Sequence, residues 1–115
     1  MQNGQAVGPT VTSGFWSALD AATGKIVWQT PDPAGAQTQD PGAVTAANGV
    51  VYGCSADPQG HMYALHATTG AVLWSFTSGG ACVAGAAIAN GMVFWGSGYR
   101  QFFTGNNKLY AFQIP

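Results

Sequence analysis

The chain has very little charge. Of its 115 residues, three are Lys or Arg, four are Asp and none is Glu, which gives a formal net charge of −1. Lys25, Arg100 and Lys108 are too few for the basic stripe that binds a phosphate backbone, so no nucleic-acid partner is predicted. A surface this poor in charge also supplies little solubility. It fits a chain that buries surface against partners or that continues beyond these residues.

A long hydrophobic run is also missing. The most apolar stretch, 81–95, is interrupted by Gly85 and by Asn90-Gly91, and it is shorter than the roughly 20 residues of a membrane-spanning helix. No membrane span is therefore predicted. Residues 1–5 contain neither the basic nor the apolar region of an export signal, so no signal peptide is predicted in this chain.

Cysteine is scarce. Two residues, Cys54 and Cys82, exclude a disulfide-rich scaffold, and they do not have the Cys-x-x-Cys spacing of zinc or redox sites. They are expected either to form one disulfide, in an oxidising compartment, or to remain buried free thiols.

What the chain does contain is a repeat. Residues 18–28 read ALDAATGKIVW and residues 64–74 read ALHATTGAVLW, which gives a period of 46 residues. A period of this size, with β-branched and aromatic residues around a Thr-Gly turn, is typical of propeller blades and not of helical solenoids. A propeller needs about 4–8 blades. A chain of this length holds about two and a half, so the ring is incomplete unless other chains or further segments close it.

Turn residues divide these blades into strands. Asn48-Gly49 and Asn90-Gly91 lie between apolar segments and tolerate the positive φ angles of type I′ turns, so each pair predicts a tight hairpin. The expected fold is all-β, made of four-stranded antiparallel blades. A partial blade covers about 10–30, a full blade about 42–76, and a second partial blade about 84–115.

The Thr-Gly turns have their own residue pattern. Asp20 can accept backbone N–H bonds at the first turn, and Gly24 and Gly70 supply the left-handed residue. His66 stands where Asp20 stands in the first copy, so it is also interpreted as a turn residue. His61 and His66 are predicted to point to opposite faces of one strand, which excludes a metal pair between them.

Two connections are longer than their counterparts in the other copy of the repeat. The connection 30–41 is about four residues longer than its counterpart, and 96–107 is about five residues longer. In blade topology these two connections emerge on the same face, together with Cys54 and Cys82. Because function in repeat proteins tends to lie in such loops, this rim is the predicted functional region.

The loop 96–107 carries the candidate ligand-binding side chains. Aromatic rings and one Arg could stack on a planar or sugar-like ligand and pair with its anion. Alternatively, the aromatic residues pack the last blade. These candidates are Trp95, Tyr99, Arg100, Phe102 and Phe103.

Other motifs give less. Asp57 beside Ser55, on the rim that also holds Asn106 and Asn107, is the best local oxygen cluster for Ca²⁺, but it is interpreted as a solvated loop and no metal site is assigned. The segment 96–101 lacks the last glycine of a dinucleotide fingerprint and opens no helix. No Gly-x-Ser-x-Gly elbow occurs.

The pattern Ala-Leu-Asp-x-x-Thr-Gly-Lys-x-x-Trp resembles the tryptophan-docking repeat of quinoprotein dehydrogenases. The whole chain is similar to the C-terminal part of polyvinyl-alcohol-dehydrogenase-like proteins, which have propeller repeats of the pyrroloquinoline quinone (PQQ) type; 42–52, 90–99 and 105–112 carry the likeness. The resemblance implies that Trp28 and Trp74 insert between neighbouring blades as structural residues.

The same resemblance implies a function. Members of the family bind PQQ beside a calcium ion held by Glu, Asn and Asp, use a further Asp as base in alcohol oxidation, and are periplasmic or secreted. This chain has no Glu, and none of its Asp residues matches a catalytic position. Its catalytic residues are therefore unknown.

Three hypotheses follow. The chain is a fragment or truncated relative of a PQQ-dependent alcohol dehydrogenase-like propeller, without a complete active site on its own. Alternatively, it is a non-catalytic propeller module for binding or assembly, or its copies combine into a ring that binds a ligand at the rim. The predicted partners are other copies of the chain or the missing blades of a longer one.

Overall fold

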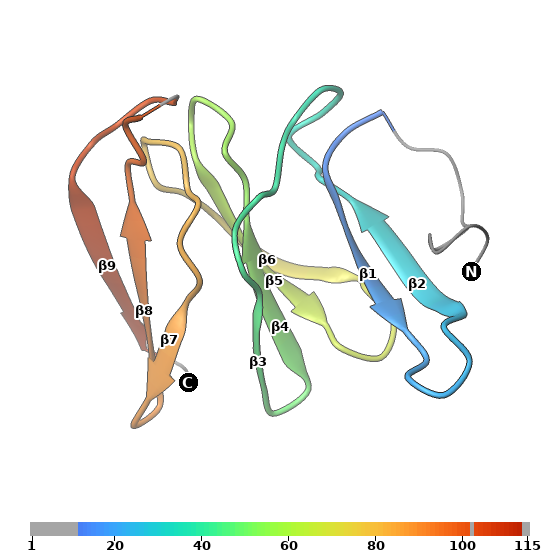
Figure 1. Ribbon diagram of the computed structural model, residues 1–115. Coiled ribbons are helices and arrows are strands. Elements are labelled where there is room, and N and C mark those ends of the chain that lie inside the picture. Colours follow the sequence, from blue (N-terminus) through green and yellow to red (C-terminus); the bar gives the residue numbers. More distant parts are fainter. Residues whose placement is uncertain (1–11, 102, 114–115) are drawn as a thin grey trace.

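The computed structural model describes residues 12–101 and 103–113, and in this part of the chain it contains three antiparallel sheets side by side and no helix (Figure 1). The predicted all-β fold of partial and complete blades is confirmed. The first sheet has two strands, the second is a complete four-stranded blade and the third has three strands. The strands are β1 (Phe15–Leu19), β2 (Ile26–Pro31), β3 (Thr45–Ala47), β4 (Val50–Cys54), β5 (His61–His66), β6 (Val72–Thr77), β7 (Ala87–Ala89), β8 (Met92–Ser97) and β9 (Lys108–Gln113).

Tight turns occupy one end of the three sheets. Asn48 and Gly49 join β3 to β4 with φ angles of 51° and 78°, and Asn90 and Gly91 join β7 to β8 with 52° and 72°, as type I′ turns require. Between β1 and β2, the Asp20 carboxylate accepts bonds from the backbone N–H groups of Thr23 and Ala22 at 2.8 and 2.9 Å. Hydrogen bonds from Thr23 and Ala22 lower the pKa of Asp20. The long connections lie at the opposite end (Figure 1).

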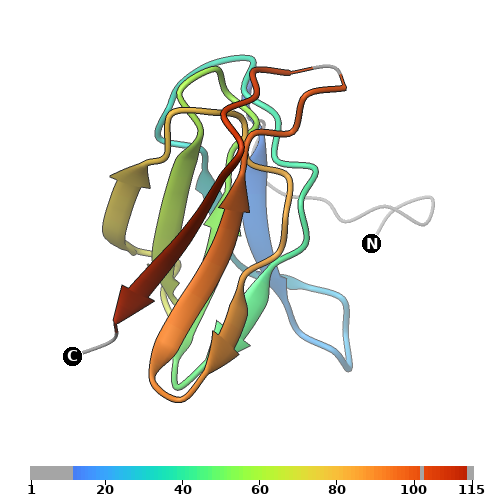
Figure 2. The ribbon, with the colours of Figure 1, turned by 90° about the vertical axis from the view of Figure 1, so that its left-hand side faces the viewer.

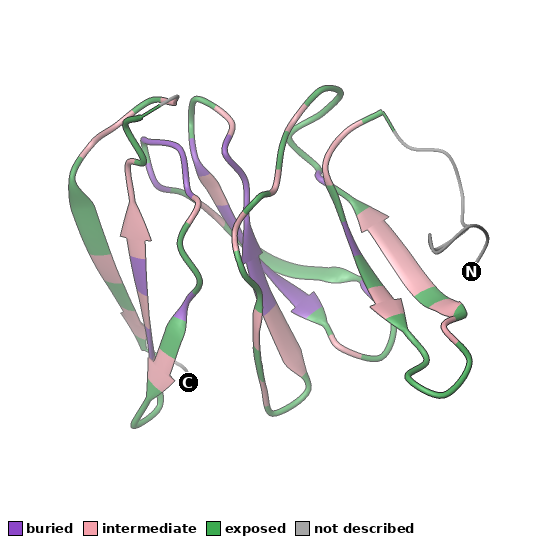
Figure 3. Cartoon of the chain, in the orientation of Figure 1, coloured by how far each residue is buried: buried purple, intermediate pink, exposed green. Residues whose placement is uncertain are grey.

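The sheets stack one behind another, as the turned view shows (Figure 2). The complete blade therefore has a neighbour on each face, and β5 is buried on both. Tyr63 and Leu65 pack with Trp16 toward the first sheet, whereas Met62 and Ala64 pack toward the third. This explains why buried residues gather on the central sheet (Figure 3). The core toward the third sheet consists of Tyr52, Cys54, Met62, Ala64, Cys82, Ala86, Val93 and Trp95.

Trp28 docks the first sheet onto the complete blade. Its indole N–H donates to the carbonyl oxygen of Ala67 at 2.8 Å, and its ring lies on Gly70 so closely that a Cβ there would be 2.5 Å from a ring carbon. The Thr30 hydroxyl donates to the Gly70 carbonyl at 2.6 Å. Gly70 is thus required twice, by its φ of 75° and by the ring above it.

Trp74 is the second copy of this residue in the repeat. It packs edge-on against Phe112 with ring centroids 5.0 Å apart, and it is 37% exposed. Its side chain makes no hydrogen bond within 12–101 and 103–113. The described part of the third sheet contains no fourth strand, and therefore no turn from a third to a fourth strand that could receive the indole.

A disulfide ties the second blade to the third. It joins Cys54 at the end of β4 to Cys82 in the β6–β7 connection, with the two Cα atoms 5.7 Å apart. Both residues belong to the apolar core between these sheets. In the structure the two cysteines form a disulfide and are not free thiols.

Substituting Gly70 by Ala should disrupt the docking of Trp28. In Gly70→Ala, the new methyl group clashes with the Trp28 ring and the residue is strained by its positive φ. In Gly49→Ala, the methyl group meets nothing within 4 Å, so the positive φ is the only source of strain. Gly49→Ala should cost about 1 kcal/mol, and Gly70→Ala about 1–3 kcal/mol more. Urea unfolding measures both, and equal losses would contradict the docking role.

Removing the disulfide should destabilise the fold by about 2–4 kcal/mol for a loop of this length. The variant with both Cys54→Ala and Cys82→Ala is compared with the unmodified protein, with and without reductant, in chemical unfolding. Reductant should lower the stability of the unmodified protein and leave the variant unchanged. An unmodified protein indifferent to reductant would show that the bond contributes nothing.

A candidate binding cavity on the rim

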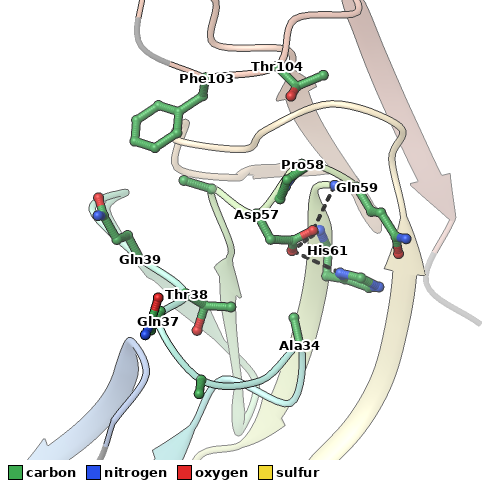
Figure 4. Close-up of a pocket in the computed structure, with 12 residues that line it drawn as sticks. Ala34, Gln37, Thr38, Gln39, Asp57, Pro58, Gln59, His61, Phe103 and Thr104 are labelled. Carbon is green, nitrogen blue, oxygen red and sulfur yellow. Dashed lines mark hydrogen bonds and ion pairs between the residues drawn. The ribbon is translucent and has the colours of Figure 1, made fainter.

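Three loops enclose a cavity of about 650 Å³ at the end of the sheets opposite the tight turns. They are the β2–β3, β4–β5 and β8–β9 connections, and two of them contain the insertions noticed in the sequence. The structure thus brings 30–41 and 96–107 to one site (Figure 4). The lining residues are Ala34, Ala36, Gln37, Thr38, Gln39, Ala56, Asp57, Pro58, Gln59, His61, Phe103 and Thr104.

Backbone hydrogen bonds fix the β2–β3 loop as one wall of the cavity. Gln37 donates its N–H to the Thr12 carbonyl at 2.8 Å, and the Thr38 carbonyl accepts from Gly14 at 2.7 Å. The Gln39 carbonyl accepts from the N–H of Ala56, on the β4–β5 loop, at 2.8 Å. Gln37 has a positive φ of 67°. These bonds run to neighbouring segments, so the wall keeps its shape without regular secondary structure.

Asp57 and His61 form the charged part of the cavity. Their side chains are 2.8 Å apart, and Asp57 also accepts bonds from the backbone N–H groups of Gln59, Gly60 and His61 at 2.8, 2.9 and 3.2 Å. Burial raises the pKa of Asp57, but the hydrogen bonds, that of the His61 side chain first, outweigh it and lower the pKa overall. A carboxylate with this many donors is a poor base, so the pair serves to close the β4–β5 loop.

The remaining polar groups of the cavity are neutral. They are side-chain amides and hydroxyls, joined by the ring of Phe103, and no Lys or Arg is among the lining residues. Such a set can donate and accept hydrogen bonds and offer one aromatic face. It suits a neutral ligand rather than an anion.

The structure separates the ligand-binding residues expected from the sequence. Trp95 is fully buried and donates its indole N–H to the Ala84 carbonyl at 2.8 Å, so its assignment to a cofactor is corrected: it is a core residue. Tyr99 is exposed and bonds Gln101, and Arg100 lies against Gly105; neither lines the rim cavity. Phe102 lies outside the described residues. Of the described members of this group, Phe103 alone lines the cavity.

The residues considered in the sequence as an oxygen cluster for Ca²⁺, to which no metal site was assigned, do not all lie together. The Asn106 amide donates to the Ser78 carbonyl at 2.7 Å and accepts from the Ser97 hydroxyl at 3.0 Å, so it belongs to a network away from Asp57. Asn107 adopts a positive φ of 53°. No group of three or more His, Cys, Asp or Glu suited to a metal occurs in the described part of the chain.

PQQ does not fit this cavity. It is a planar quinone with three carboxyl groups, which call for cationic partners and an aromatic platform on its ring faces. None of Lys25, Arg100 and Lys108 lines the cavity, and Trp95 is buried. The lining of this cavity therefore does not fit PQQ.

Sequence reasoning pointed to the two loops, but of the described side chains it selected there, Phe103 alone lines the cavity between them. The amides and hydroxyls of Gln37, Thr38 and Gln39 gave no motif, and the Thr104 hydroxyl joins them from the separate β8–β9 loop. Asp57 and His61, four residues apart and flanking a Gly turn, gave the one usable signal.

Fold and site together define a section of a β-propeller with a loop-lined cavity on its rim. The chain belongs to the family described as outer membrane protein assembly factor BamB, a family of PQQ-like repeats, whose model matches residues 13–114. Among curated proteins, no sequence matches the chain significantly. The predicted PQQ-type repeat family is confirmed, while the likeness to polyvinyl-alcohol-dehydrogenase-like proteins stays a prediction. No helix long and apolar enough to cross a membrane occurs in the described residues.

Proposed function

We propose that the chain is a non-catalytic section of a β-propeller, which binds a neutral, hydroxyl-rich ligand in the rim cavity. The observation that carries the proposal is the chemistry of the lining: amides, hydroxyls and one aromatic ring around about 650 Å³. Amides and hydroxyls can pair with the hydroxyl groups of a polyol or sugar, and an aromatic ring can cover the C–H face of such a ligand.

The absence of a free base in this cavity favours binding over catalysis. Asp57 is the one carboxylate among the lining residues, and its oxygens are already taken by His61 and by three backbone N–H groups. General-base catalysis needs a group that can reach the proton of its substrate with a suitable pKa. Any alcohol dehydrogenase activity would thus depend on residues and on a PQQ site contributed by other blades.

We also propose that the protein works outside the cytoplasm. Disulfides persist in oxidising compartments, and Cys54 and Cys82 are joined. The matching family is named for the assembly of outer membrane proteins. A platform role in such a compartment agrees with a chain that offers a cavity and open sheet edges rather than an active site.

The partners proposed for this platform are further blades, supplied by other copies or by a longer chain. In the described part of the fold, β9 has no neighbour on its outer edge, and Leu109 on it is 75% exposed. Beside it, an apolar groove of about 620 Å³ runs along Trp74 and Phe112. Trp28 shows what fills this place at the other junction: a strand whose turn supplies a carbonyl and a glycine.

A neutral polyol should bind the cavity, and this is testable by NMR titration with sorbitol. Backbone signals of 34–39 and 57–61 should shift, with a dissociation constant in about the millimolar range. Phe103→Ala and Gln39→Ala should each weaken binding about fivefold, because one contact worth ~1 kcal/mol is lost. Gln101→Ala, on the same rim but outside the cavity, should have no effect. Tighter binding of PQQ than of sorbitol to this cavity would favour the dehydrogenase hypothesis instead.

The open edge of β9 should make the 115-residue chain self-associate. Native mass spectrometry over a range of concentrations should show assemblies larger than 11.8 kDa, because an unpaired, apolar strand edge binds other strands. Leu109→Lys should reduce their share, whereas Val44→Lys, at an exposed position in the β2–β3 loop, should not. A monomer at every concentration would contradict closure by copies of this chain.

A further inference from the structure

Two buried carboxylates close to the rim cavity have no counter-charge. Asp32 follows β2 directly and is 3% exposed. Its Oδ1 accepts the N–H of Ala34 at 2.8 Å, and its Oδ2 is inaccessible to solvent and has no hydrogen-bond partner in the described structure. An isolated buried carboxylate oxygen is costly, so this atom needs an explanation.

Asp40 lies near Asp32 and has two oxygens that lack a partner in the same way. Both of its carboxylate oxygens are inaccessible and without a partner among the described residues. The carboxyl group is pressed against Gly14, where a Cβ would come within 2.3 Å of Oδ2. Three inaccessible carboxyl oxygens without a described partner therefore belong to two residues that both contact Gly14.

The neighbouring groups offer oxygen but no positive charge. The hydroxyl of Tyr63 lies near Asp32 and that of Ser55 near Asp40, yet neither satisfies the unpaired oxygens. Asp57 adds negative charge at a longer range, with His61 directed to it. Burial first, and then the Asp32 carboxyl, raise the pKa of Asp40 to about 8. Without a cation the Asp40 carboxyl therefore holds a proton at neutral pH, and a bound cation has to displace that proton.

We propose that Asp32 and Asp40 bind a hard divalent cation, of which Ca²⁺ is the best fit. The donors are all oxygen, with no imidazole or thiolate for zinc or copper. Ca²⁺ accepts irregular sets of carboxylate, hydroxyl, carbonyl and water oxygens, whereas Mg²⁺ requires near-ideal octahedral geometry. With two carboxylates the affinity belongs in the range of extracellular modules, a dissociation constant of about 10⁻⁴–10⁻³ M.

A cation at this site would hold the β2–β3 loop in place. Asp32 and Asp40 bracket the segment 34–39 that forms one wall of the rim cavity. Asp32 also holds the start of this loop to the first sheet, because its N–H donates to the Gly14 carbonyl at 2.9 Å. A cation between the two carboxylates fixes both ends of the wall, so it orders the cavity without touching a ligand in it.

The experiment measures cation binding directly, independently of the rim ligand. Thermal unfolding of the EDTA-treated protein at pH 7 is followed with and without 10 mM Ca²⁺, where the unmodified protein should gain about 5–15 °C. Tb³⁺ bound at the same site should luminesce when the protein is excited, because Tyr63 is a neighbour of Asp32 and its ring lies 5.4 Å from that of Trp16. Ca²⁺ should displace the signal.

Conservative variants assign the effect to these residues. Asp32→Asn and Asp40→Asn keep the shape of the side chain and should abolish both the Ca²⁺ shift and the Tb³⁺ signal. Asp20→Asn, in an exposed turn, should retain both. The proposal is overturned if Ca²⁺ stabilises the Asn variants as much as the unmodified protein. It is also overturned if the unmodified protein shows neither response, which would mean that the two carboxyls share a proton instead. Failure of sorbitol to bind would leave this result standing.

Discussion

The contact on which the described fold depends is the docking of one sheet on the next through Trp28. A two-stranded or three-stranded sheet buries little apolar surface by itself, so the blades need their neighbours. The indole supplies a large apolar face and one N–H, and the neighbouring turn supplies a carbonyl at Ala67 and a bare backbone at Gly70. The Cys54–Cys82 disulfide does a comparable task at the other junction, where Trp74 has no such turn among the described residues.

The same stacking places chemistry on the rim. The strands of each blade are antiparallel, so successive connections alternate between the two ends of the sheet. The long connections therefore lie at one end and the tight turns at the other (Figure 1). Loops from three different sheets can then enclose one cavity, although none of them carries a site alone. The cavity forms because neighbouring sheets pack together, so the contacts that hold the sheets in place also hold the cavity walls in place.

Electrostatics distinguishes the two acidic features of this rim. Asp57 is surrounded by N–H groups and by His61, and its negative charge is satisfied within its own loop. Asp32 and Asp40 are buried side by side, with three oxygens that no described group satisfies. The first arrangement stabilises a turn, and the second calls for a cation from outside the chain. Low overall charge makes this contrast sharper, since no Lys or Arg lies near enough to neutralise the pair.

The sequence by itself determined the blades. The repeated ALxAxTGxxxW phrase, the Asn-Gly turns and the two long connections are local patterns, and local patterns are enough to specify strands, turns and loop lengths. Only the tertiary structure decided which side chains meet. Trp95 and Phe103 are both aromatic residues near one loop, yet the first is core and the second lines the cavity, since burial depends on the neighbouring sheet. Asp32 and Asp40, in the same way, look like loop residues until folding brings them together under Gly14. Contacts between distant segments are set by how the sheets stack, and no period in the sequence records that.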